Sequence, residues 1–341
     1  MTLRGALIGC GFFAHNHMRA WADLSGAEIV AVCDSDAEKA EAFALAYNAR
    51  AFTDAATMLA EIRPDFTDIV TTATSHRPLV ELAAKLSGGV ICQKPLALTL
   101  EDARAMVSAC EAAGVPLLVH ENFRWQAPLR ATLAHLHEGS IGRPHFLRLT
   151  FRHAFDIYAG QPYLAEIGDL ALTDIGPHMF DMAGALMGDV TRVYCQTQKL
   201  NVRVHGPDAF LAQLTHVGGG VSCIECSFFS HYAPDRFPQS LFVIEGEGGS
   251  IELLDNFRLR LHRNGDMTEI DVEPPVPAWG EKPWHLVQDS VIAFQAHATE
   301  ALNGREQGQP TGANSLKTLA LTMAAIRSAA TGQAIFLSQE Y

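Results

Sequence analysis

The sequence has little positive charge for its length. Its 341 residues include 25 lysines and arginines against 38 aspartates and glutamates, which gives a formal net charge of -13. An acidic chain repels phosphate backbones and anionic headgroups, so this balance argues against nucleic acid or a membrane surface as a partner. The net charge does not exclude a small substrate, because the substrate's own site can be locally basic.

Long apolar runs are missing as well. No stretch approaches the ~20 apolar residues of a membrane span, and the N-terminal residues lack the pattern of a signal peptide. We therefore expect a cytoplasmic protein. A hydrophobic content of 48% with 18% charged residues is typical of a folded globular chain, and 341 residues suffice for two domains with separate cores.

The seven cysteines form no framework. Only Cys223 and Cys226 make a C-x-x-C pair, which is compatible with zinc binding or redox work, but a zinc ribbon would need a second pair. The flanking alternation of apolar and polar residues predicts a strand instead, in which residues three apart point to opposite faces. We interpret the pair as structural and expect no metal.

Apolar runs alternate with amphipathic helical patterns in residues 1–121. Strands are expected at residues 4–9, 27–34, 50–54, 67–74, 89–95 and 115–120, and helices at 12–24, 36–48, 54–64, 75–88 and 99–114. Thr99 stands at the cap position of the last helix, with acidic residues in its first turn. This alternation predicts βαβ units and a doubly wound parallel sheet, that is, a Rossmann-type nucleotide domain.

The pattern changes in residues 122–341. Helices are expected at residues 127–139, 173–188, 283–304 and 312–332, and longer strands at 143–155, 190–200, 208–217, 219–230, 239–254, 257–263 and 267–273. Turn residues separate the strands, which favours an antiparallel sheet. We predict an α+β domain with a large, mostly antiparallel open sheet. Its uncovered face would be buried in a homo-oligomer, a dimer or a tetramer.

A glycine-rich motif lies between the first strand and the first helix. Gly9, Gly11 and Ala14 form G-x-G-x-x-A, and Asp34 follows at the end of the second strand, close to the expected ~20 residues further on. Gly9 permits the tight turn, Gly11 lets a pyrophosphate approach the helix N-terminus, and Asp34 accepts hydrogen bonds from ribose hydroxyls. The alternative is an ordinary βα turn with a capping aspartate.

The residues around Asp34 predict which dinucleotide binds. A carboxylate at this position repels a 2′-phosphate, and the following Ser35, Asp36 and Ala37 include no arginine. We therefore expect NAD rather than NADP. Phe12 and Phe13 within the motif, and Ser35 beside Asp34, are expected to contact the cofactor too.

A lysine lies at the end of an expected buried strand, where a charged group is costly. The strand expected at residues 89–95 ends in Gln93, Lys94 and Pro95. Open α/β sheets place their ligands at the carboxyl ends of the strands, so Lys94 is a candidate for the cleft. A surface lysine with its ammonium group in water is the alternative.

A second candidate pair lies at the expected helix 173–188. Asp174 and His178 are four residues apart, which places them on one helical face, and Pro177 marks the first turn. Imidazole suits proton transfer because its pKa lies near the working pH. A helix-capping or core histidine is the alternative.

Four segments occur in an order and spacing that resemble the Gfo/Idh/MocA oxidoreductase family. They are residues 9–14, 68–79, 92–98 and 173–181, and the likeness extends over essentially the whole chain. The resemblance implies that Lys94 is catalytic, that His178 is the general base and that Asp174 binds the substrate and orients the other two. The family's usual Glu-Lys-Pro is Gln93-Lys94-Pro95 here, and this glutamine agrees with a narrower group of sugar dehydrogenases. The resemblance also raises a cis Lys94–Pro95 bond.

Further site residues are expected from the same segments and their neighbours. The predicted cofactor contacts are Thr71, Thr72, His76, Gln93, Lys94, Asn122 and Arg124. The predicted substrate contacts, besides the catalytic residues, are Trp125, Gln161 and Tyr163. Core packing is the alternative for Trp125.

Together these features predict an NAD-dependent sugar dehydrogenase that oxidises the anomeric hydroxyl of a cyclic aldose to a lactone. One alternative keeps the chemistry with another polyol, an inositol or a sugar acid, and includes a coupled isomerisation. The other alternative is a non-catalytic NAD and sugar sensor, which would be expected to lose the catalytic set that this sequence retains.

Overall fold

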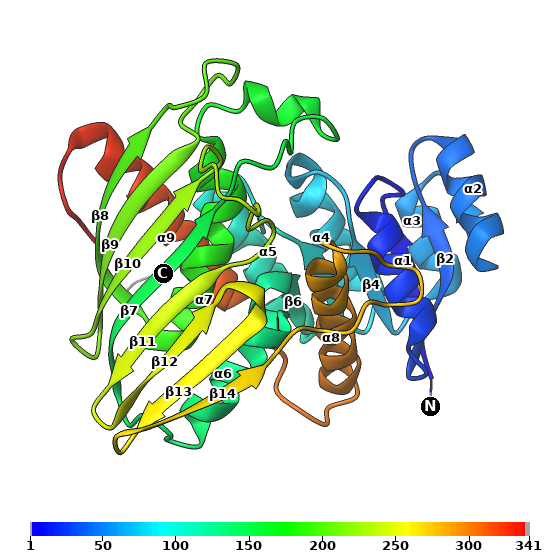
Figure 1. Ribbon diagram of the computed structural model, residues 1–341. Coiled ribbons are helices and arrows are strands. Elements are labelled where there is room, and N and C mark those ends of the chain that lie inside the picture. Colours follow the sequence, from blue (N-terminus) through cyan, green and yellow to red (C-terminus); the bar gives the residue numbers. More distant parts are fainter. Residues whose placement is uncertain (1, 338–341) are drawn as a thin grey trace. The chain divides into compact units, whose positions relative to one another are not determined.

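The computed structural model describes residues 2–337, which divide into two compact units (Figure 1). Within this range, the first unit comprises residues 2–122 and 290–319, and the second comprises residues 123–289 and 320–337. The first unit is the predicted doubly wound domain and the second is the predicted α+β domain.

The first unit contains a six-stranded sheet in the order β3-β2-β1-β4-β5-β6, with every pairing parallel. Its strands are β1 (Leu3–Ile8), β2 (Ala27–Cys33), β3 (Arg50–Phe52), β4 (Phe66–Ile69), β5 (Val90–Gln93) and β6 (Leu117–His120). The strand order reverses direction between β1 and β4. Ligands of such sheets bind outside the carboxyl ends of the strands at this switch point.

Side-chain caps determine where several helices of the first unit begin. The helices are α1 (Ala14–Asp23), α2 (Ala37–Tyr47), α3 (Ala55–Ile62), α4 (His76–Leu86) and α5 (Leu100–Ala113). Asp36 and Asp54 accept backbone N–H bonds at the starts of α2 and α3. Thr99 accepts from the Asp102 amide at the start of α5, which confirms the predicted cap.

Residues from late in the chain complete the first unit. Helix α8 (His285–Leu302) packs Phe294 against His120, with 4.6 Å between the ring centroids, and the Gln295 amide donates to the His17 carbonyl. Further on, the Val119 amide donates to the Pro310 carbonyl. A sequence division at residues 121 and 122 assigns all of these late residues to the second domain. The structure differs because β6 is the edge strand, and residues 290–319 cover it.

The second unit is built on a nine-stranded sheet in the order β14-β13-β12-β11-β7-β10-β9-β8-β15. The strands are β7 (Pro144–Arg152), β8 (Val190–Gln198), β9 (Ala209–His216), β10 (Val221–Ser227), β11 (Leu241–Gly246), β12 (Gly249–Leu254), β13 (Arg258–Arg263), β14 (Asp266–Asp271) and β15 (Ile335–Phe336). Among the pairings of these nine described strands, β7–β10 alone is parallel. Helices α6 (Ala127–His137), α7 (Gly176–Met187) and the end of α9 (Gly312–Thr331) contribute to the core on one face.

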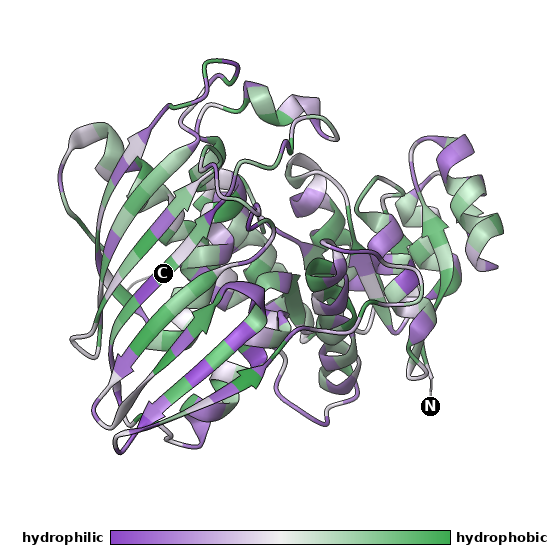
Figure 2. Cartoon of the chain, in the orientation of Figure 1, coloured by the Kyte–Doolittle hydropathy of each residue, from purple (hydrophilic) through white to green (hydrophobic). Residues whose placement is uncertain are grey.

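The other face of the large sheet is open. Hydrophilic and hydrophobic residues alternate along its strands in Figure 2, as expected where one face of a sheet is buried and the other is not. On β10, Cys226 is buried in the core while Cys223 is half-buried on the open side, which confirms that the two cysteines point to opposite faces.

No helix within residues 2–337 is long and apolar enough to cross a membrane. Nor does that range hold a group of three or more histidine, cysteine, aspartate or glutamate side chains arranged for a metal ion. All seven cysteines are free thiols.

Candidate functional site

The glycine motif forms a tight turn directly after β1. Gly9 has a φ of +99°, and a Cβ there would lie 2.6 Å from the Val70 carbonyl oxygen, so this position requires glycine. Gly11 differs: it is exposed, and a Cβ there would meet nothing within 4 Å. The fold therefore needs Gly9, while Gly11 leaves open space over the start of α1, as a bound pyrophosphate requires.

Asp34 joins the end of β2 to this turn. Its Oδ2 accepts a hydrogen bond from the Cys10 amide at 2.8 Å, and its Oδ1 accepts from the Asp36 amide at 2.9 Å. Burial, and then the Asp34 carboxylate, raises the pKa of the Cys10 thiol to about 12, so no thiolate adds charge to the turn. Ser35 and Asp36 follow and are exposed. A half-buried carboxylate beside an open glycine turn fits an NAD ribose and disfavours a 2′-phosphate.

The two phenylalanines of the motif differ in exposure. Phe12 is 69% exposed. Phe13 is half-buried and contacts the His17 and His120 rings edge-on, with centroid distances of 5.5 and 6.1 Å. Phe12 is therefore available to a ligand, whereas Phe13 forms part of the wall beneath the turn.

The segment after β4 lies across the switch point from the glycine turn. Thr71 and Thr72 precede a short 3-10 turn, where the Ser75 hydroxyl donates to the Thr71 hydroxyl at 2.8 Å. A Cβ at Gly9 would lie 2.8 Å from the Thr71 methyl group, so Thr71 borders the glycine turn. Thr72 is exposed.

His76 connects two loops at the carboxyl edge of the sheet. Its Nδ1 lies 3.0 Å from the Pro95 carbonyl oxygen and its Nε2 lies 3.2 Å from the Thr71 carbonyl oxygen. Burial lowers the pKa of His76, although these carbonyl groups and that of Leu96 partly oppose the shift. The ring is fully buried, so the structure gives His76 the task of holding the Lys94–Pro95 loop against the loop after β4.

Lys94 directly follows the last residue of β5. It is half-buried, its backbone N–H donates to the Gln93 Oε1 at 2.7 Å, and the Lys94–Pro95 bond is cis. Gln93 is 8% exposed. The glutamine side chain therefore bonds the backbone that carries Lys94.

The segment after β6 crosses from one unit to the other. Asn122, in the first unit, donates from its amide to the Ser290 hydroxyl at 2.8 Å. Arg124, in the second unit, makes two 2.7 Å hydrogen bonds from Nε and Nη2 to the two carboxylate oxygens of Asp181. Asp181 is 1% exposed at its side chain, so this is a bidentate pair with one member fully buried.

The Arg124–Asp181 pair fixes the helix that carries His178. His178 is 3% exposed and stacks on Phe123, with 3.9 Å between ring centroids and 9° between planes. Asp181 is one turn further along α7. The ring and the ion pair together hold this helix against Phe123 and Arg124 of the same unit.

Asp174 lies in a π-helical turn, Ala171–Ile175, that leads directly into α7. Such turns occur frequently at functional sites. The predicted helix entry is thus confirmed, with the difference that Asp174 and His178 belong to turns of different pitch. Asp174 is half-buried. Burial raises the pKa of Tyr158 and of Cys226, and the charge of Asp174 adds to both shifts.

The other expected substrate residues lie on two segments of the second unit. Tyr163 is 63% exposed and donates from its hydroxyl to the Gln161 Oε1 at 2.9 Å, both at the short turn Pro162–Glu166. Trp125 is half-buried at the end of the 3-10 turn Asn122–Trp125.

Three polar residues of this region were not predicted from the sequence as cofactor, substrate or catalytic contacts. They are His17 and Asp68, which are fully buried in the first unit, and Asp181. The sequence held two signals: His17 lies on the apolar face of the expected helix 12–24, and Asp68 lies inside an expected buried strand. Both indicate hydrogen-bond partners, because buried polar groups require them.

Family comparisons agree with this geometry. Residues 3–121 match the profile described as "Oxidoreductase family, NAD-binding Rossmann fold" of GFO_IDH_MocA, and residues 129–252 match the GFO/IDH/MocA C-terminal domain. Two relatives are named D-apiose dehydrogenase. That of Paraburkholderia graminis is 47% identical over 98% of this chain and 89% of its own length. That of Rhizobium rhizogenes is 43% identical over 98% of this chain and 97% of its own length.

A solved structure is similar over nearly the whole chain. It is an oxidoreductase from Agrobacterium radiobacter in complex with NAD+, L-tartaric acid and magnesium, with a TM-score of 0.95, 42% sequence identity and coverage of 98% of both chains.

Proposed function

Since the chain belongs to the Gfo/Idh/MocA family of NAD-dependent oxidoreductases, we propose that it oxidises the anomeric hydroxyl of a cyclic aldose, D-apiose, to the corresponding lactone. The observation that carries the substrate assignment is the identity of 47% and 43% to two D-apiose dehydrogenases over 98% of the chain. The retention of Lys94, Asp174 and His178 supports catalysis over sensing.

The proposed mechanism divides the reaction between cofactor and protein. NAD, when bound, accepts a hydride from the anomeric carbon. His178 takes the hydroxyl proton, and its stacking on Phe123 holds the ring in one orientation for that transfer. Lys94 hydrogen-bonds the same oxygen and stabilises its developing negative charge, while Asp174 binds a hydroxyl of the sugar. The anomeric carbon loses a hydride and its hydroxyl loses a proton, so the exocyclic C–OH becomes the lactone carbonyl and the ring oxygen is retained.

The cofactor contacts follow from the first unit. We propose that Gly9, Gly11 and Phe12 border the pyrophosphate, that Asp34 and Ser35 bind the adenosine ribose, and that Thr71, Thr72 and Gln93 line the remaining length. Phe13, His76 and Asn122 then support this surface through the buried contacts described above. In the second unit Arg124 acts through its pair with Asp181, and Trp125, Gln161 and Tyr163 contact the sugar.

A substrate panel tests the assignment. NADH formation is followed by absorbance with D-apiose, other aldoses, inositols and sugar acids, each with NAD and with NADP. We expect D-apiose with NAD to give the highest kcat/KM. Turnover of an inositol or a sugar acid with D-apiose inert would contradict the substrate, and faster turnover with NADP would contradict the role of Asp34. No turnover of any compound would favour a sensor.

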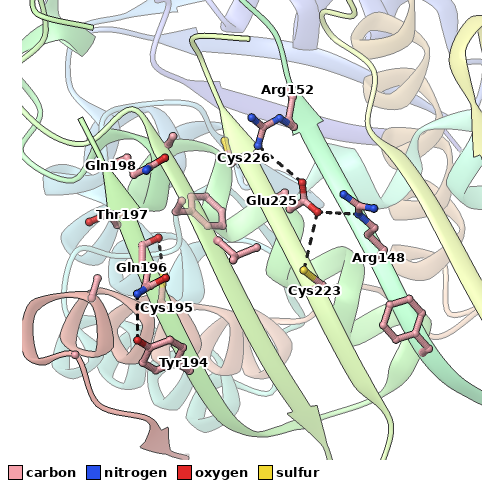
Figure 3. A pocket seen from close by; sticks show the side chains of 16 residues that line it. Arg148, Arg152, Tyr194, Cys195, Gln196, Thr197, Gln198, Cys223, Glu225 and Cys226 are labelled. Carbon is pink, nitrogen blue, oxygen red and sulfur yellow. Dashed lines mark hydrogen bonds and ion pairs between the residues drawn. The ribbon is translucent and has the colours of Figure 1, made fainter. Parts of the chain in front are cut away.

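We also propose that the open face of the nine-stranded sheet is the contact between copies in a dimer or tetramer. The face has a hollow of about 1010 Å³ lined by β7, β8, β9 and β10 (Figure 3). Within it Glu225 pairs with Arg148 at 2.8 Å and with Arg152 at 3.8 Å. Leu211 and Val221 on the same face are 38% and 47% exposed. Apolar side chains flanked by paired charges are typical of a surface that a partner covers.

A further inference from the structure

A buried polar chain lies beneath the glycine turn, within the first unit. The Asp68 Oδ2 accepts two hydrogen bonds of 2.8 Å, one from the Trp21 Nε1 and one at the His17 Nδ1. The His17 Nε2 lies 3.4 Å from the Gln93 Nε2. Asp68 and His17 are 0% exposed and Gln93 is 8% exposed, so water does not replace these partners.

The positions of the protons in this series of hydrogen bonds follow from the groups at its two ends, the Asp68 carboxylate and the Lys94 amide. A carboxylate only accepts hydrogen bonds, so the Asp68 side requires a hydrogen on the His17 Nδ1. A backbone amide only donates, so the Lys94 N–H requires the carbonyl oxygen of Gln93 toward it, at 2.7 Å. That orientation turns the Gln93 amide nitrogen toward His17, and the His17 Nε2 then accepts its hydrogen bond with a lone pair. Both ends agree on a neutral ring protonated at Nδ1.

We propose that His17, held by Asp68, is a positioning residue for Lys94: its Nε2 fixes the Gln93 amide, and Gln93 fixes the backbone from which Lys94 extends. This inference rests on the proposed catalytic role of Lys94. His17 touches neither substrate nor cofactor in this account. The ring also packs against His120, with 4.1 Å between centroids and 36° between the ring planes.

The same series of hydrogen bonds explains why residue 93 is a glutamine. A carboxylate there would accept from the Lys94 amide equally well, but its second oxygen would face the lone pair of the His17 Nε2. Two acceptors in a buried site repel each other unless a proton is added. An amide supplies the donor that a neutral ring needs, so Gln93 and the His17–Asp68 pair form a matched set.

Two substitutions of His17 separate its two hydrogen bonds. Asparagine places a donor where the Nδ1 lies and loses the acceptor at the Nε2, so His17→Asn keeps the hydrogen bond to the Asp68 Oδ2 but releases Gln93. Glutamine reaches the Nε2 position instead, so His17→Gln restores an acceptor for Gln93. Trp21→Phe is the matched control, because it removes a hydrogen bond of equal length to the same Asp68 oxygen and retains both His17 and Gln93.

The measurements are kcat, KM for NAD and sugar, the melting temperature, and amide hydrogen exchange of Lys94 in the cofactor-free protein. For His17→Asn we expect kcat to fall about ten- to hundredfold with little change in KM, because a small misplacement of a catalytic group has effects of this size. Exchange at the Lys94 amide should become faster. His17→Gln should recover most of kcat, and Trp21→Phe should lower the melting temperature without these effects.

The outcomes distinguish this inference from the proposed function. Unchanged Lys94 amide exchange in His17→Asn, or an equal loss of kcat in Trp21→Phe, would overturn the positioning role even if Lys94→Ala were inactive. An active Lys94→Ala enzyme would overturn the proposed function, while the exchange data would still decide the positioning. Should the His17 variants fail to fold, Gln93→Met removes both side-chain bonds at similar volume, and faster Lys94 exchange is expected there too.

Discussion

Single residues carry the chemistry in this account, and each is constrained by a neighbour that the structure identifies. His178 is stacked on Phe123, and Lys94 extends from a backbone bonded to Gln93. Because these contacts hold the groups before any ligand binds, removal of one catalytic side chain should change turnover far more than binding.

Replacement of Lys94 tests this at the residue scale. Lys94→Ala should lower kcat by about 10²- to 10⁴-fold, the usual effect of losing a group that acts on the transferred proton or its oxygen. NAD affinity, measured by fluorescence titration, should change little. Lys85→Ala, at an exposed lysine of α4, is the control and should keep full activity. Near-normal turnover of Lys94→Ala would remove Lys94 from the mechanism.

The sequence predicted those residues whose signal is local. Gly9, Gly11 and Asp34 stand at fixed spacings within one βαβ unit, and Thr99 caps the helix that follows it directly. The partners of Asp68 could not be predicted, because the distance along the chain to His17 is 51 residues and only the folded sheet brings the two together. The Arg124–Asp181 pair spans 57 residues and was missed for the same reason.

At the scale of elements, the two glycines of the nucleotide turn have different tasks. Gly9 is required by its own φ of +99° and by the Val70 carbonyl oxygen. A Cβ at Gly11 would meet nothing within 4 Å, so we propose that only the bound cofactor requires glycine there. Gly9→Ala should therefore destabilise the first unit by ~2 kcal/mol or more, from backbone strain. Gly11→Ala should keep the melting temperature of the unaltered protein and lose most of its NAD affinity. Equal melting temperatures for the two variants would contradict this division.

The segment after β7 predicts a pH dependence of stability. His153 is 1% exposed among Phe151, Phe228 and Phe237, and burial lowers its pKa to about 4, slightly opposed by the charge of Asp235. Between pH 6.5 and about pH 4 this histidine is protonated in the unfolded chain and neutral in the folded chain. The free energy of unfolding therefore keeps its full value above pH 6.5 and falls as the pH drops toward 4. The loss is about 2 kcal/mol from about pH 7 to about pH 5.

Urea unfolding at these two pH values checks the histidine. His153→Phe should reduce the difference in unfolding free energy by that amount, because a phenyl ring takes no proton. His137→Gln, at an exposed position of α6, should leave the difference unchanged. An unaltered pH dependence in His153→Phe would show that another group is responsible.

The order of the elements could be predicted where strands and helices alternate, because each helix and strand has its own recognisable spacing of apolar residues. The assignment of α8 was not, because the sequence of residues 283–304 shows an apolar face without showing what it covers. The structure packs Phe294 and Gln295 of this helix on His120 and His17, which returns the chain to the first unit.

At the scale of the whole molecule, the open sheet predicts the assembly. Leu211→Glu combined with Val221→Glu places two charges where the proposed contact is apolar, so the oligomer should dissociate in light scattering coupled to gel filtration. Leu45→Glu is the control, because Leu45 is 88% exposed on α2 and outside this face. A native protein that is already monomeric, or an unchanged mass for the double variant, would contradict the proposed contact.

The proposed function requires that the hydride come from the anomeric carbon of D-apiose. D-apiose carrying deuterium at that carbon is incubated with the enzyme and NAD, and the reduced cofactor and the sugar product are examined by mass spectrometry. We expect deuterium in the reduced cofactor and an unlabelled lactone. Reduced cofactor without deuterium, or no reduction of NAD by D-apiose, would contradict the proposed function.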